Sequence, residues 1–131
     1  MIGLYGIYRA EPSASADLTP LAATVSSHYA CHGRSDTGAT LGCATHIHDR
    51  GAAIVAESGW MAAAIGEIFN AADVLGGSGA PPPSLAALAL HLAREGRLDR
   101  LAHANGLFAL ALYERAAHRL ILVTDRHASF P

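Results

Sequence analysis

The sequence predicts one domain of mixed α/β class in which most strands pair antiparallel. Its 131 residues fit one domain, and a chain of this length buries roughly two-thirds of its unfolded surface. Strand-like segments stand at both ends of the chain, with a helical stretch between them. Short turn-forming stretches separate the segments, and neither a repeat nor a long linker interrupts them.

The first third of the chain predicts a strand, a helix and a loop. Residues 1–8, MIGLYGIY, do not alternate between apolar and polar, which is typical of a strand buried on both faces. Thr19 and Pro20 suit a helix start, and the spacing of Leu21, Val25 and Tyr29 places apolar side chains on one helix face. The stretch CHGRSDTGA, residues 31–39, predicts a turn-rich loop.

Five further segments predict strands, at 39–47, 52–57, 60–66, 106–114 and 119–125. Ser58-Gly59 and the stretch RAAH are the turns between two pairs of them. These turns are short, so the strands that they join pair antiparallel.

The helical stretch in the middle of the chain has clear boundary signals. A brief helical piece follows Asn70, and GGSGAPPP at 76–83 predicts a loop rich in helix breakers. Ser84 caps a helix over 84–95, and Gly96 ends it. We interpret the loop at 76–83 as a connector, and a loop that contacts substrate is the alternative.

Composition excludes several classes of function. The formal net charge of −2 gives no footprint for nucleic acid, and no apolar run is long enough to span a bilayer. Cys31 and Cys43 are not spaced as a metal or redox pair, so we expect a reduced, cytoplasmic protein. Either cysteine is an alternative nucleophile, but neither stands at a terminus or beside an evident base.

Histidines are the other candidates for site chemistry. His46 and His48 share one face of a strand, and Asp49 and His32 are in range by sequence. No clear third ligand stands nearby, so surface histidines are favoured and no metal site is predicted.

Four stretches, in order along the chain, resemble the N-terminal glutaminase domain of asparagine synthetases. GEIFN at 66–70 resembles the family's Gly-Glu-Ile-Tyr-Asn, and 106–131 resembles its later hairpin ending in Arg-Asp. HGRSD at 32–36 resembles His-Arg-Gly-Pro-Asp, and 1–8 resembles the N-terminal strand. The resemblance covers nearly all of residues 1–131. The matching residues expected to have packing and turn roles include Gly3, Gly66, Glu67, Asn70, Gly106 and Asp125.

That family is the class II glutamine amidotransferases. The resemblance implies an α+β (αββα) fold of the N-terminal-nucleophile (Ntn) hydrolase type, in which two stacked antiparallel sheets lie between helix layers. In the family, position 2 is a cysteine whose thiol attacks glutamine while its own α-amine acts as base. Here Ile2 replaces that cysteine, so no catalytic residue is expected in this chain.

The rest of the family's glutamine pocket is also replaced in this sequence. Thr45 stands where an arginine holds the substrate carboxylate, and threonine cannot make that bidentate contact. Ile65 replaces the asparagine of the oxyanion hole, which leaves the Gly66 backbone N–H. A position near Ser84 replaces the aspartate that binds the substrate amine. These residues define a degenerate glutamine pocket.

The resemblance therefore implies an inactive glutaminase-like region of an ATP-dependent, amide-forming ligase, in first place a lasso-peptide cyclase. Such a ligase closes an amide on an amine of its own substrate and needs no ammonia. The alternatives are a β-lactam synthetase-type ligase, a glutamine-hydrolysing asparagine synthetase or amidotransferase, and a free-standing peptide-binding module.

The resemblance also implies partners. ATP and Mg²⁺ would belong to a C-terminal synthetase domain with a Ser-Gly-Gly-x-Asp-Ser loop, a run that these 131 residues do not contain. We expect contacts with that domain and with a peptide substrate, and none with nucleic acid or membrane. We also expect a truncated sheet, whose exposed edge strands favour self-association.

Overall fold

The strands form two antiparallel sheets. The computed structural model describes residues 3–9, 29–46, 53–77, 79–127 and 129. One sheet has the strand order β1-β3-β2, and the other has the order β4-β5-β6-β7. The bounds are β1 (Gly3–Tyr8), β2 (Tyr29–Asp36), β3 (Ala39–His46), β4 (Ala53–Glu57), β5 (Trp60–Ile68), β6 (Gly106–Glu114) and β7 (Arg119–Thr124). All the strand pairs of the described residues are antiparallel, which confirms the predicted pairing and an α+β class.

The prediction of a loop over 31–39 is wrong. Cys31–Asp36 lie in β2, and only Thr37 and Gly38 form the turn into β3. Gly38 takes a φ of 91°, a left-handed conformation that glycine adopts without a steric penalty. The polar residues of this stretch favour a loop, but β2 is an edge strand and its residues 32–35 are exposed. An exposed edge strand does not need alternating apolar and polar residues.

The prediction that Tyr29 lies on a helix face is also wrong. Tyr29 is the first residue of β2 and pairs with His46 of β3. Tyrosine suits a strand as well as a helix, so spacing alone did not decide between them. The rest of that predicted helix, from Thr19, lies outside the described residues, and so does any helix layer that it would place over β1-β3-β2.

The other predicted strands form over the described residues. The expectation that the first strand is buried on both faces is wrong, because β1 is an edge strand whose residues are half-buried or exposed. Ser58 and Gly59 have φ of 52° and 80° and make the two-residue turn between β4 and β5. Residues 115–118 connect β6 to β7, as predicted, and His118 takes a φ of 46°.

Three helical segments lie between β5 and β6. α2 (Ala71–Leu75) is the brief piece expected after Asn70, and α3 (Leu85–Arg94) begins where the Ser84 hydroxyl accepts a hydrogen bond from the Ala87 N–H at 3.2 Å. The 3₁₀ helix η1 (Leu98–His103) was not predicted, because it buries too few apolar residues to show a period. None of the described helices combines the length and the apolar character that crossing a membrane requires.

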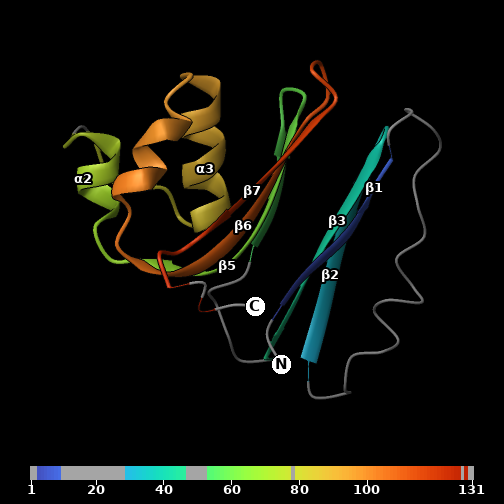
Figure 1. Cartoon of the computed structure of the whole chain (residues 1–131), viewed down its shortest axis with the longest axis horizontal. Helices are drawn as coiled ribbons and strands as arrows, with labels where there is room; N and C mark the ends of the chain where they lie inside the picture. The colour runs from blue at the N-terminus through green and yellow to red at the C-terminus, as the bar shows by residue number, and fades with distance from the viewer. Residues whose placement is uncertain (1–2, 10–28, 47–52, 78, 128, 130–131) are drawn as a thin grey trace.

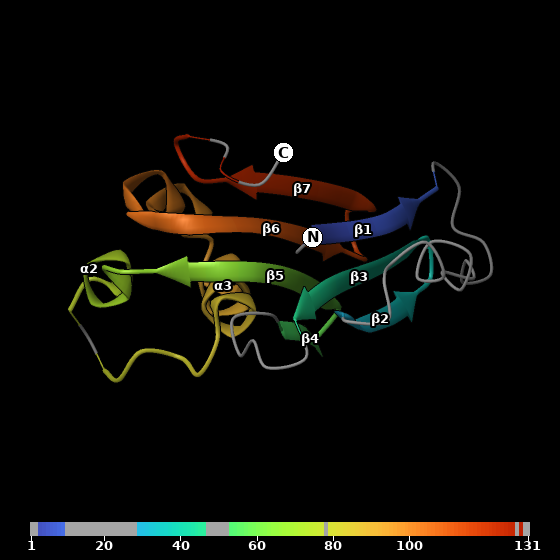
Figure 2. The same cartoon turned by 90° about the horizontal axis from the view of Figure 1, so that it is seen from below.

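The elements stack in three layers, with the helices on one face of β4-β5-β6-β7 and the other sheet on the opposite face (Figures 1 and 2). Alternate residues of β5 and β6 therefore enter two different cores. Phe108 and Leu112 pack toward the helices, whereas Met61 and Tyr113 pack between the sheets. All four side chains are 0–1% exposed.

Hydrogen bonds tie the two sheets together at one end of the stack. The buried Tyr113 hydroxyl donates to the Thr37 carbonyl at 2.5 Å and lies 3.0 Å from His118 Nδ1. Burial, and next the charge of Asp36, raises the pKa of Tyr113, so this hydroxyl stays protonated. Arg115 makes two hydrogen bonds to the Asp36 carboxylate across the same two hairpins. We call this end the closed end.

Candidate functional site: a groove at the open end of the sheets

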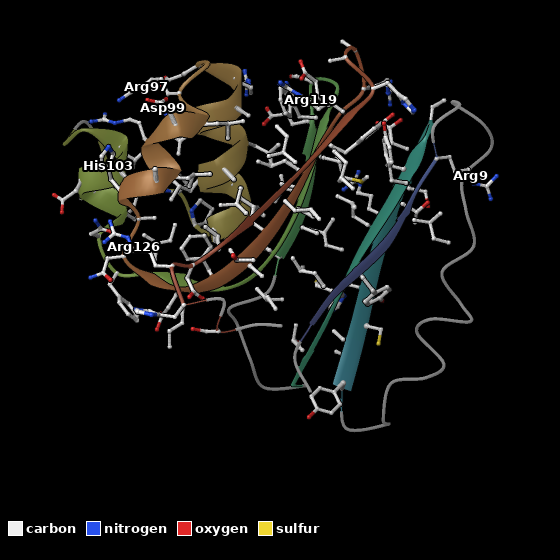
Figure 3. All side chains as sticks on the ribbon, in the orientation of Figure 1. Arg9, Arg97, Asp99, His103, Arg119 and Arg126 are labelled. Carbon is white, nitrogen blue, oxygen red and sulfur yellow. The ribbon has the colours of Figure 1, made fainter. Side chains whose placement is uncertain are left out.

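The GEIFN motif, residues 66–70, lies at the opposite end of the sheets, next to Gly106 and Asp125. We call this end the open end. Figure 3 shows the two ends: Arg9 and Arg119 lie near the closed end, and Arg126 lies near the other. Gly66 takes a φ of 84°, and a Cβ there would overlap the Leu107 carbonyl oxygen. A Cβ at Gly106 would likewise overlap the Glu67 carbonyl oxygen. The two glycines thus allow β5 and β6 to approach closely at this end.

Asn70 holds the end of β5 against the segment that leads into β6. Its Oδ1 accepts from the Asn105 N–H at 2.7 Å, and its Nδ2 donates to the His103 carbonyl at 3.1 Å. The Phe69 N–H donates to the Asn105 carbonyl at 2.7 Å. The motif asparagine therefore fixes backbone geometry at the open end.

Asp125 holds the end of β7 in the same way. Its carboxylate is 6% exposed in the folded chain and accepts from the backbone N–H groups of Phe108, His127 and Ser129 at 2.8–3.3 Å. Desolvation disfavours its charged form, but these hydrogen bonds and that of the Ser129 hydroxyl together outweigh it and hold the pKa of Asp125 below its ordinary value. Asp125 is thus an ionised framework residue.

The lowered pKa predicts how Asp125→Asn responds to acid. The carboxylate contributes stability above its unfolded-state pKa of about 3.9, and loses it as the pH falls through its lower folded-state pKa. Wild type should be more stable than Asp125→Asn at neutral pH, with the gap closing below about pH 4. Urea unfolding of both proteins at several pH values measures the gap. A gap that stays constant down to pH 2 would contradict this assignment.

A groove of about 860 Å³ opens beside this frame. Residues 66–69 of the motif and residues 81–85 line it, together with Ala71, Ala72, Leu88 and Leu107. Phe69 is 62% exposed and Leu107 is 49% exposed, so both present apolar surface at the groove. Among the described residues that line the groove, Glu67 is the only charged one. Such a lining can bind an apolar ligand and orient a cation.

The described residues of the degenerate glutamine pocket divide between the groove and the buried interior. Gly66 and Ser84 line the groove, but the Ser84 hydroxyl caps α3. Ile65 is 0% exposed and packs between the sheets with Cys43 and Ala109. Thr45 is also buried, on β3. Ile2 lies outside the described residues. Gly3, also predicted from the motifs, begins β1 opposite Ala44.

The two cysteines lie on neighbouring strands, and the buried Cys43 is not arranged as a nucleophile. Cys43 is 0% exposed, and burial, with a smaller effect from Cys31, raises its pKa to about 11. The reactive thiolate of Cys43 is therefore scarce at neutral pH. Cys31 lies on the neighbouring strand, opposite Ala44, as a free thiol.

The predicted histidine pair contributes no described metal site. His46 ends β3, while His48 and Asp49 lie outside the described residues. His32 lies on β2, exposed and opposite Cys43. Within the described ranges, no three histidine, cysteine, aspartate or glutamate side chains gather as a metal site would require.

Sequence reasoning missed the groove itself. Its signals were present: three prolines at 81–83 form a wall without backbone donors, and Phe69 follows the strand end. What the sequence does not contain is the distance between these two segments. They are brought together by the packing of α3 on β5, which buries Leu85 and Leu88 in the shared core.

No protein-family model and no curated protein sequence matches this chain. The fold and the groove define the class of molecule: a two-sheet α+β domain with an apolar, singly charged groove at one end of its sheets.

Proposed function

We propose that this chain is a glutaminase-like domain that does not hydrolyse glutamine, within an asparagine synthetase-like, ATP-dependent ligase that forms amides. Among such ligases we propose a lasso-peptide macrolactam cyclase. The observation that carries the proposal is Ile65, which is 0% exposed among apolar side chains where the resembling family needs an oxyanion-hole asparagine.

The arrangement of the sheets supports the finer fold. Two antiparallel sheets enclose a shared core, and helices cover one of them. The Ntn-hydrolase fold has this plan, with a second helix layer on the other sheet. In this proposal Gly66, Gly106 and Asp125 are kept because they hold strand ends together, a role independent of catalysis.

The polarity of the interior supports the loss of activity. Glutamine binding requires a cation for the carboxylate, an anion for the amine and donors for the oxyanion. Thr45 and Ile65 supply neither charge, and no arginine lines the described groove. The buried Cys43 thiol, with its pKa raised to about 11, is no substitute nucleophile.

A ligase whose substrate contains its own amine gains nothing from an ammonia supply. The domain then acts as a scaffold that packs on the synthetase domain and contacts the peptide substrate. ATP and Mg²⁺ belong to that other domain in this proposal, and the ligase works in the cytoplasm.

The proposal predicts that the chain neither binds nor hydrolyses L-glutamine. With glutamine at about 10 mM, above the usual range of KM values, a glutamate dehydrogenase-coupled assay should detect no ammonia beyond the buffer blank. Isothermal titration should give no binding heat. An active class II amidotransferase is the positive control. Ammonia release that depends on this chain would refute the proposal.

The reading frame tests the ligase half of the proposal. Sequence beyond codon 131 that encodes a Ser-Gly-Gly-x-Asp-Ser loop supports a synthetase partner. The whole ligase, given ATP and a candidate peptide, should then join a side-chain carboxyl to the N-terminal amine, with the carboxyl oxygen leaving on AMP and pyrophosphate released, so that the peptide mass falls by about 18 Da. A stop codon, with no synthetase chain binding this domain, would contradict it.

A further inference from the structure

We propose that the groove binds an extended peptide segment by adding it as a strand to the edge of β5 that no described strand covers. The segment has a basic residue between two apolar residues. The inference deepens the proposed function and rests on it for the identity of the peptide as the ligase substrate. The groove's own geometry determines the chemistry of the segment.

The first step is the edge itself. β4 pairs with β5 only from Trp60 to Ala64, whereas β6 pairs with β5 as far as Ile68. Residues 65–68 therefore have a strand on one side and, among the described residues, none on the other. Figure 2 shows β5 running past β4 toward α2. Backbone groups at such an edge are a template for another strand.

The second step is the groove beside this edge. Residues 66–69 and the prolines at 81–83 line the same space, so an added strand would lie between them. Prolines offer no N–H to compete for the incoming backbone. The volume of about 860 Å³ is within the range of ligand sites and suits a short extended segment.

The third step is the pattern of side chains. Glu67 pairs with Leu107, and these two side chains share one face of the sheet. Ile68 is on the other face and packs against the core that contains Leu85 and Leu88. Because side chains alternate along a strand, a peptide residue beside Glu67 has neighbours that face the apolar wall.

The fourth step is charge. Glu67 is exposed and, among the described residues, makes no hydrogen bond or ion pair, and every other lining residue is uncharged. A lysine or arginine on the Glu67 face is therefore matched in charge, whereas a glutamate there is repelled. The two apolar neighbours contact the wall formed by Pro82 and Leu85. The segment that fits has the order apolar–basic–apolar.

Two labelled peptides test the proposal: Ac-Thr-Val-Lys-Val-Thr-NH₂ and the same peptide with glutamate in place of lysine. Fluorescence anisotropy with the full chain at low salt should show binding of the lysine peptide about threefold or more tighter than the glutamate peptide. Glu67→Gln should abolish the preference, and Glu67→Lys should reverse it. N-methylation of the central peptide nitrogens should weaken binding of either peptide, because it removes donors to the edge.

Asp99→Asn is the matched control, because it also removes one exposed carboxylate but lies on η1, outside the groove (Figure 3). It should leave the preference unchanged. Equal binding of the two peptides, or a preference that Glu67→Lys does not alter, would overturn the inference, as would no binding of either peptide. Those outcomes leave the glutamine assay unaffected, whereas glutamine hydrolysis would refute the proposed function and leave the peptide result standing.

Discussion

Replacing Gly66 by alanine is expected to lower the free energy of unfolding by about 2–5 kcal/mol. A φ of 84° costs an L-residue about 1–2 kcal/mol, and the added Cβ would overlap the Leu107 carbonyl oxygen. The overlap forces β5 and β6 apart at the open end, and overpacking of this kind costs a further 1–3 kcal/mol or so. Urea unfolding followed by circular dichroism measures the loss.

Gly59→Ala separates the two causes. Gly59 has a nearly equal φ of 80°, but nothing lies within 4 Å of the Cβ that it would gain. It should therefore lose only the backbone contribution, about 1–2 kcal/mol. Equal losses for the two variants would show that the strands do not approach as closely at Gly66 as the structure describes.

Leu112→Ala is expected to destabilise the chain by about 3–5 kcal/mol. Leu112 is 0% exposed in the core between β4-β5-β6-β7 and the helices, so truncation leaves a cavity as well as removing apolar contact. Thermal and urea unfolding of the variant measure the change.

Leu122→Ala is the matched substitution on the neighbouring strand. Leu122 is 71% exposed, and its removal should change stability by less than about 0.5 kcal/mol. A loss at Leu122 comparable to that at Leu112 would mean that another chain or segment covers this face of β7 in solution. Analytical ultracentrifugation would then show which of the two covers it. A dimer would indicate a second copy, as the expected self-association predicts, and a monomer would indicate a segment of the same chain.

The proposed loss of glutamine hydrolysis and the proposed binding of a peptide share one physical idea. The open end keeps the residues that hold strands together, namely Gly66, Asn70, Gly106 and Asp125, while Ile65 occupies the interior with an apolar side chain. A frame of this kind is costly to alter, because the two glycines lie against backbone that a Cβ would overlap and the hydrogen bond from the Phe108 N–H to Asp125 is buried. Groove residues such as Glu67 carry no such constraint and are available for recognition.

Much of the candidate site lay in the sequence as separate pieces. GEIFN and the proline run were visible, and Ser84 was correctly predicted as a helix cap. The interpretation of Ser84 and Ile65 as members of one pocket did not anticipate that they lie on different sides of β5. Neighbouring residues of a strand point to opposite faces of the sheet. The order of residues in a motif does not show which of the two faces packs against the helices and which against the other sheet.

Local chemistry determined the strands of the second sheet, the turns at Ser58-Gly59 and 115–118, and the ends of α3. Each depends on residues within a few positions: left-handed turn residues, a hydroxyl cap and continuous apolar runs. Only the tertiary structure decided that 31–36 is a strand, because an edge strand is held by its partner β3 and needs no pattern of its own. The groove also exists only through long-range packing, since α3 lies on β5 and brings residues 81–85 beside Glu67.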